Sequence, residues 1–338
     1  KYEWKSIIFG QSAGESRNSI EVLEDGTIRL SAKDNGGKIT GDHDGISFYY
    51  VELDAEKDNF ELSADIRVIE YAKDPHDGQE SFGIMARDAI GTHLDSSVFS
   101  SNIAAVGGFS GGTRDPNGTQ LFVRTGVEDP SGAGSKGIQK VMIDPVKPDA
   151  SNTHPNKPYR LTLAKTNSGF TAKLNDGEEA IIYATDILNV QDPKMYVGFY
   201  VARVATIEVS NIKLVVTDAA TDAPKVEPPV APVTPSLSIA SLDKTSETDY
   251  TLRVLANVDG VVTIRKGQEV LVADAPVTGD KQYTLATTIA ANATTNFSIT
   301  FLPSDTQNLT SYDKIVRNFS VTMKTYRNGE DIYVSPTG

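Results

Sequence analysis

The chain consists largely of short runs of alternating apolar and polar residues, separated by turn sequences. Residues 60–71 (FELSADIRVIEY) and 159–166 (YRLTLAKT) show this period of two, and EDG, NGG, PNG, NSG and NDG stand between such runs. Alternation places one face of a strand in a core, and Gly and Asn accept the positive φ of tight turns. No long stretch has the period of a helix. The sequence therefore predicts an all-β protein.

A proline-rich segment interrupts this pattern. Residues 218–236 (DAATDAPKVEPPVAPVTPS) have no apolar periodicity, so we expect an extended linker between residues 1–217 and residues 237–330. Ten or so strands in about 215 residues predict a two-sheet sandwich for the first domain. Seven strands in about 100 residues predict an immunoglobulin-like sandwich for the second.

Composition excludes several classes of function. The net charge is −13, which disfavours nucleic acid as a partner and suits a soluble extracellular protein or one that binds cations. There is no cysteine, so disulfides and thiolate metal sites are excluded. No run of about 18 apolar residues predicts a membrane span.

Three carboxylates form a possible catalytic motif. Glu52, Asp54 and Glu56 fit the Glu-x-Asp-x-Glu pattern of retaining β-glucanases with a jelly-roll fold. On a strand, alternation would place all three on one face, at the close spacing that retention needs. Residues 54–59 (DAEKDN) read as a turn, however, which would leave the carboxylates solvated and divergent. We therefore keep a glycoside hydrolase only as the weaker alternative.

Asp42 and Asp44 are candidate metal ligands. Their spacing and the following Gly45 are typical of the start of an oxygen-ligand loop. No Glu follows at the offset that an EF-hand requires. We expect a structural Ca²⁺ somewhere in the first domain, with this pair as one possible site and a polar turn as the alternative.

Arginine and tyrosine side chains at strand positions are candidate ligand contacts. Arg forks can bind sugar hydroxyls or a carboxylate at two points, and Tyr offers a stacking face with a hydroxyl. The alternative is that the Arg residues pair with neighbouring acids and the Tyr residues pack. The predicted ligand-binding residues are Arg87, Asp88, Arg124, Tyr50, Tyr200 and Arg203.

A family resemblance extends these inferences. The sequence DGISFYYVEL (44–53), followed by NFELSADIRV (59–68) and QESFGIMARDAIG (79–91), resembles concanavalin-like modules of bacterial polysaccharide-degrading enzymes. The modules it most resembles are the fructan-recognising carbohydrate-binding modules of family 66. The resemblance implies a concanavalin or jelly-roll-like sandwich that binds polysaccharide.

The last ten residues carry a second resemblance. GEDIYVSPTG (329–338) is similar to the opening of the right-handed β-helix in polysaccharide lyase family 9 pectate lyases. The resemblance implies that residues 331–338 begin a catalytic β-helix domain that continues beyond this chain. It also implies that the chain is the non-catalytic N-terminal region of a secreted bacterial lyase, so no lyase activity is expected of it.

These observations favour a binding module and spacer that hold a pectate lyase on plant cell-wall polysaccharide. The ligand stays open between a pectic and a fructan-like polymer, and the chain is expected to be a monomer. The alternative is a structural or adhesive pair of β modules without a sugar site.

Overall fold

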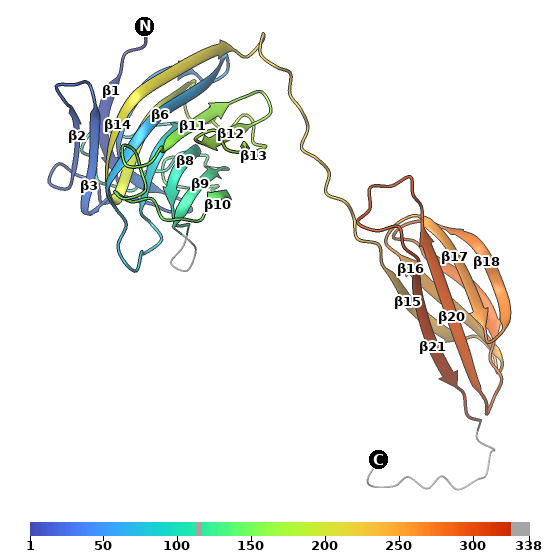
Figure 1. The fold of residues 1–338 in the computed structure, drawn as a ribbon. Coiled ribbons are helices and arrows are strands. Elements are labelled where there is room, and N and C mark those ends of the chain that lie inside the picture. Colours follow the sequence, from blue (N-terminus) through green and yellow to red (C-terminus); the bar gives the residue numbers. More distant parts are fainter. Residues whose placement is uncertain (112–116, 326–338) are drawn as a thin grey trace, which may run out of the picture. The chain divides into compact units, whose positions relative to one another are not determined.

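The alternating runs form strands throughout. The computed structural model describes residues 1–111 and 117–325, and every regular element in these ranges is a β-strand. The chain divides into two units, Lys1–Pro228 and Pro229–Gly338 (Figure 1). The boundary lies inside the expected linker, and residues 329–338 lie outside the described ranges.

The first unit contains fourteen strands in the described ranges. They are β1 (Lys5–Gly10), β2 (Asn18–Val22), β3 (Ile28–Gly36), β4 (Lys38–Ile39), β5 (Asp44–Asp54), β6 (Asp58–Tyr71), β7 (Ser81–Arg87), β8 (Ile103–Phe109), β9 (Gly118–Arg124), β10 (Ile138–Asp144), β11 (Arg160–Lys165), β12 (Phe170–Leu174), β13 (Ala180–Ile182) and β14 (Lys194–Asp218).

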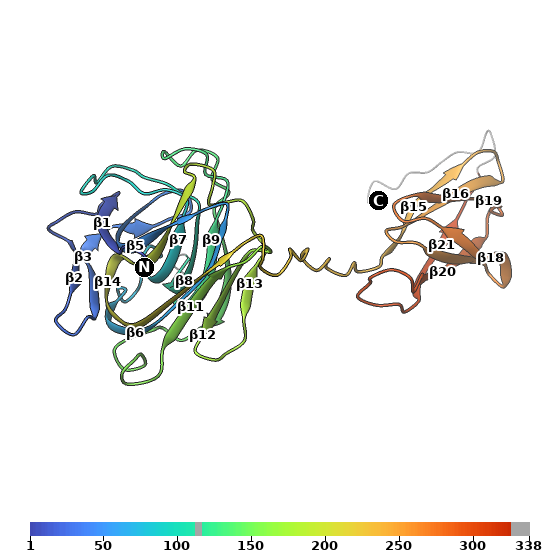
Figure 2. The same cartoon turned by 90° about the horizontal axis from the view of Figure 1, so that it is seen from above.

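Two antiparallel sheets form this unit. Sheet A has the order β10-β9-β8-β7-β14-β5-β1, with β4 beside the start of β5. Sheet B has the order β2-β3-β14-β6-β11-β12-β13. The two sheets lie face to face, and the view in Figure 2 shows them as two layers. The expected concanavalin or jelly-roll-like sandwich is confirmed.

Strand β14 belongs to both sheets. Lys194–Val201 pairs with β5, whereas Ala205–Asp218 pairs with β6, and the register shifts between Arg203 and Ala205. Arg203 has a φ of 72°, in the left-handed region. The sequence predicts two strands here, at 195–204 and 207–216. That prediction is wrong, because the backbone turns at Arg203 from one sheet into the other and β14 continues as a single strand.

The inner core fills the space between the sheets. It takes the inward-facing residues of both, such as Leu62 and Ile66 of β6 and Ile84 of β7. Trp4 packs on its margin, 5.1 Å from the ring of Tyr49. Period-two alternation therefore predicts the inner core correctly.

A second apolar cluster, here called the outer cluster, covers the other face of sheet A. Phe48, Met85 and Phe122 belong to it, and Ile90 and Phe99 from the loop after β7 pack on them. As a result, β7, β8 and β9 are buried along their whole length. The middle of sheet A is therefore enclosed on both faces, whereas its edge strand β10 is largely exposed.

The second unit has the expected seven strands in its described part. They are β15 (Leu237–Lys244), β16 (Asp249–Ala256), β17 (Gly260–Lys266), β18 (Glu269–Val277), β19 (Gln282–Thr288), β20 (Thr294–Pro303) and β21 (Ile315–Thr322). Sheets β15-β16-β19 and β18-β17-β20-β21 enclose a core that includes Tyr250, Ile264 and Phe301. The expected immunoglobulin-like sandwich is confirmed.

The proline-rich segment is attached at both ends to its own unit. In the first unit, Asn167 donates to the carbonyls of Ala219 and Ala223, and Val226 N donates to Ser168 Oγ at 2.8 Å. In the second unit, Val233 N donates to the carbonyl of Asn308 at 3.0 Å. The expected linker is therefore hydrogen-bonded to the first unit as far as Val226.

Candidate functional site

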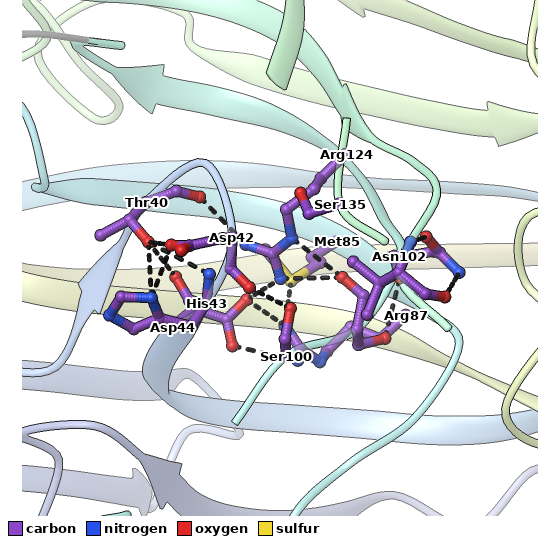
Figure 3. Close-up of polar contacts among 12 residues, drawn as sticks. Thr40, Asp42, His43, Asp44, Met85, Arg87, Ser100, Asn102, Arg124 and Ser135 are labelled. Carbon is purple, nitrogen blue, oxygen red and sulfur yellow. Dashed lines mark hydrogen bonds and ion pairs between the residues drawn. The ribbon is translucent and has the colours of Figure 1, made fainter. Parts of the chain in front are cut away.

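Three of the predicted site residues meet in one buried ion cluster (Figure 3). The carboxylate of Asp44, at the start of β5, accepts from Arg87 at 3.0 and 3.1 Å and from Arg124 at 2.5 Å. Arg87 ends β7 and Arg124 ends β9, on the outer face of sheet A. All three side chains have 0% exposure. We call these three residues the ion cluster.

Backbone carbonyls use further guanidinium donors. Arg87 Nε donates to the carbonyl of Ala89 at 3.1 Å, and Arg124 donates to the carbonyls of Ser101 and Thr40. The guanidinium of Arg87 also lies 5.2 Å from the ring centre of Phe9. These contacts tie the loops over the outer cluster to the strand ends beneath them. The ion cluster therefore has a structural role: it holds these loops on the sheet, and it presents no surface to a ligand.

The electrostatics of the ion cluster keep Asp44 ionised. Burial on its own would raise the pKa of the Asp44 carboxyl, but the charges of Arg87 and Arg124 and their hydrogen bonds lower it below 3.8. A carboxylate between two guanidinium groups leaves one net positive charge in the interior. Such a group is stable only while all three members are present.

Asp88 has a separate structural role. Its carboxylate accepts from Asn102 Nδ2 at 3.2 Å and from the backbone N–H groups of Val190 and Gln191 at 3.1 and 2.9 Å. Burial raises the pKa of Asp88, against these hydrogen bonds. The side chain therefore fastens the loop before β14 to the end of β7, rather than facing solvent beside Arg87.

The two tyrosines belong to the outer cluster. Tyr50 is 5% exposed and stacks on Phe48 with ring centres 5.1 Å apart. Tyr200 is fully buried, and its hydroxyl lies 2.6 Å from Ser81 Oγ. Burial raises the pKa of Tyr200 well above its usual value. Neither ring offers a free face for a sugar to stack on.

Arg203 lies apart from the ion cluster, at the corner of β14. Its Nε donates to Asp77 Oδ2 at 2.6 Å, and Lys73 reaches the same oxygen at 3.0 Å. Partial burial raises the pKa of Asp77, but the hydrogen bonds from Lys73 and Arg203 lower it to about 2. Arg203 thus holds the loop after β6 at the corner.

The candidate metal pair does not form a ligand set. The Asp42 side chain is 67% exposed and bonds Thr40 and His43, whereas Asp44 is buried between two cations. Within residues 1–111 and 117–325, no group of three or more His, Asp or Glu is placed to hold a metal ion. These two residues therefore do not fit Ca²⁺. A Ca²⁺ elsewhere in the first unit stays a prediction.

The three carboxylates of the hydrolase motif diverge. Glu52 pairs with Lys5 and Lys194 at 3.2 and 2.8 Å, and Asp54 accepts from the backbone N–H groups of Glu56 and Lys57. Asp54 and Glu56 are exposed. The turn expected from DAEKDN forms after β5, so the motif does not assemble an acid and a nucleophile.

The sequence analysis missed a polar groove on the outer face of sheet B. This sheet B groove has a volume of about 370 Å³ and crosses four neighbouring strands, β14, β6, β11 and β12. The alternation in residues 159–166 and 170–175 already places these polar side chains on one face, which was the available signal. The groove lining includes Glu61, Ser63, Arg160, Thr162, Lys173 and Lys213.

Fold and site together define a pair of β-sandwich modules. Residues 11–219 match the family model of the pectate disaccharide-lyase N-terminal domain, and residues 238–321 match that of the pectate disaccharide-lyase central Ig-like domain. The chain belongs to the pectate disaccharide-lyase N-terminal domain family. The expected resemblance to the non-catalytic N-terminal region of a pectate lyase is confirmed, as is the expectation that this chain is not itself the enzyme.

The curated relatives are longer than this chain. Pectate lyase L of Thermoclostridium stercorarium is 62% identical over 338 residues, which is 100% of this chain and 27% of that protein. Pectate disaccharide-lyase of Dickeya chrysanthemi is 25% identical over 374 residues, covering 99% of this chain and 49% of that protein. The chain thus spans about a quarter and about half of their lengths.

A solved structure aligns with this chain at low sequence identity. A protein of unknown function with a galectin-like fold from Bacillus subtilis aligns over 63% of this chain and 88% of its own, at 13% identity and a TM-score of 0.37. Among the described residues of this chain, no helix is long and apolar enough to cross a membrane.

Proposed function

We propose that this chain is a polysaccharide-binding module with an immunoglobulin-like spacer, and that it holds a secreted pectate lyase on the pectic polysaccharide of plant cell walls. The observation that carries the proposal is the match of both units, in order, to the N-terminal and central domains of pectate disaccharide-lyases. Catalysis then belongs to the part of the parent protein that this chain does not span, for which the resemblance at residues 329–338 implies a β-helix.

The benefit of such a module is a concentration effect. A module bound to the polymer keeps the attached enzyme near its substrate without any new chemistry. Even a weak sugar affinity is useful, because many equivalent binding positions follow one another along one polysaccharide chain.

The test is binding by the isolated 338-residue chain. Calorimetry and affinity electrophoresis against polygalacturonate, methyl-esterified pectin, arabinan and levan should show binding to a pectic polymer. Binding to levan alone would assign a fructan ligand instead. Absence of binding to all four would reject the proposal in favour of a structural or adhesive module, a function that the enclosed outer face of sheet A favours.

A further inference from the structure

The outer faces of the two sheets differ in how open they are to a polymer. The outer cluster and its covering loops close the outer face of sheet A over β7, β8 and β9, which are fully buried, and leave only its edge at β10 exposed. On sheet B, the outward residues of β11 and β12, such as Arg160, Thr162 and Lys173, are partly exposed. A long ligand lying across strands therefore has access to sheet B.

The sheet B groove has one cation held in place. Arg160 donates to Asp65 Oδ1 at 3.2 Å, to the carbonyl of Asn211 at 3.0 Å and to Ser63 Oγ at 2.8 Å. These contacts fix the guanidinium on the groove wall, 33% exposed, before any ligand arrives. Fixed polar groups lose less entropy when they bind.

Two further cations in the groove are free. Within the part of the chain that the structure describes, Lys173 on β12 and Lys213 on β14 have no ion pair or side-chain hydrogen bond. Each ammonium carries three donors. The lining also holds three carboxylates, Glu61, Asp176 and Glu179, against the three cations, so the groove carries no net positive charge. Its two unpaired lysines, on two strands, are the cations that can each pair with a carboxylate of a ligand.

The remaining lining completes the chemistry of a sugar acid. Glu61, Asp176 and Glu179 can accept hydrogen bonds from hydroxyls, and Thr162 and Thr171 can donate or accept. The described lining contains no aromatic side chain, so stacking contributes nothing. A polymer with both carboxylates and hydroxyls at each repeat matches this set, whereas a neutral polymer leaves the lysines unused.

We propose that the sheet B groove binds an acidic, uronate-containing polysaccharide, with Lys173 and Lys213 pairing with its carboxylates. This proposal rests on the proposed function and names the site and the ligand class for it. Because the contacts are ionic and partly exposed, binding weakens with salt.

The experiment compares two double variants of the full chain. Lys173→Gln/Lys213→Gln removes the free cations of the groove. Lys57→Gln/Lys136→Gln makes the same change in net charge at two exposed lysines outside it. We expect affinity for polygalacturonate, measured by calorimetry at low salt, to fall about tenfold or more in the groove variant, which corresponds to about 1.4 kcal/mol. The control should stay within about twofold of the parent chain.

Thr162→Trp provides a second test without a change of charge, because a large ring on β11 fills the groove. It should also abolish binding, while circular dichroism confirms that the variant folds. If the parent chain binds polygalacturonate and both groove variants bind it as tightly as the parent does, the sheet B groove is not the binding site, and the proposed function stands. Binding of neutral polymers alone would likewise contradict the assignment of an acidic polysaccharide to the groove. If the parent chain binds no polymer, both proposals fail.

Discussion

At the residue scale, the ion cluster brings more positive than negative charge into the protein interior. Asp44 is the only carboxylate that Arg87 and Arg124 contact in the described structure, and it bonds both. Removing one member of a buried ionic group costs more than the group contributes, because the remaining charges stay buried without a partner. The cluster is therefore a sensitive point of the first unit.

Asp44→Asn should destabilise the first unit by about 3–5 kcal/mol, because two buried guanidinium groups lose their counter-ion. Unfolding in urea can be followed by the fluorescence of Trp4, the only tryptophan of the chain, which packs in the first unit. The control is Glu52→Gln, since Glu52 pairs with two lysines that are 40% and 57% exposed, and it should change stability by about 0–1 kcal/mol. Equal effects of the two variants would contradict the structural role of the ion cluster.

The stabilising effect of Asp44 should depend on pH. The pKa of Asp44 is below 3.8 in the folded state and near 3.8 when unfolded, so its stabilisation is complete above about pH 4 and is lost as pH falls through the folded pKa. The difference in unfolding free energy between the parent chain and Asp44→Asn should thus be constant from about pH 5 to about pH 7 and shrink below about pH 4. A difference that is unchanged at about pH 3 would show that the carboxylate charge is not what stabilises the unit.

Sequence alone selected Asp44 as a metal ligand and Arg87 and Arg124 as ligand contacts, and left open the alternative that the Arg residues pair with acids, which is the arrangement in the structure. An Arg at a strand end looks the same whether a loop covers it or solvent does, and the covering residues, such as Phe99, lie far away in sequence. The common location of Arg160, Lys173 and Lys213 in one groove was missed for a different reason. Alternation marks them as outward-facing, but only the pairing of β6, β11, β12 and β14 shows that they share a groove.

At the element scale, β14 determines the architecture of the first unit. Its two halves hydrogen-bond to β5 and β7 in one sheet and to β3 and β6 in the other. Local pattern predicted both halves, because each alternates. It could not show that they form one strand, since the corner depends on the left-handed backbone of Arg203, a residue type that rarely adopts it.

Gly198 in β14 allows the neighbouring strand to approach closely. A Cβ at this position would lie 1.9 Å from the carbonyl oxygen of Tyr49 and 2.6 Å from the Cα of Tyr50. Gly198→Ala should therefore destabilise the first unit by about 1–3 kcal/mol or more, measured by Trp4 fluorescence in urea. Gly14→Ala is the matched control, with no atom within 4 Å of the added Cβ, and should stay within about 0.5 kcal/mol of the parent chain. Similar stabilities for the two variants would mean that β5 can move aside.

At the scale of the whole molecule, the chain is two sandwiches with separate cores. Strand number and turn spacing were enough to predict both folds, because two-layer β packing leaves few alternatives for such patterns. The end of the first unit was harder to predict. Residues 219–226 lack periodicity, yet Asn59 and Asn167 bind them through side-chain amides, which no local pattern indicates.

Truncation tests where the first unit ends. A chain of residues 1–228 should show the same Trp4 unfolding transition as the full chain, because it keeps the inner core, the outer cluster and the bound segment. A chain of residues 1–217 loses the contacts of Asn59 with Asp222 and of Ser168 with Val226, each about 1 kcal/mol, and should be less stable. Equal stability of the two truncated chains would show that residues 218–228 do not stabilise the first unit.

The position of β14 has a mechanical consequence. The chain leaves the first unit after the bound residues 219–226, which follow directly on Asp218, the last residue of the 25-residue strand β14. Force that reaches β14 from that end loads first its ladder with β6, which runs to Asp218, and then its ladder with β3, which ends at Val209, so many hydrogen bonds share the force. The sheet B groove lies over β14 and its neighbours, so tension between a bound polysaccharide and the rest of the polypeptide would pass through the most extensively paired strand of the unit.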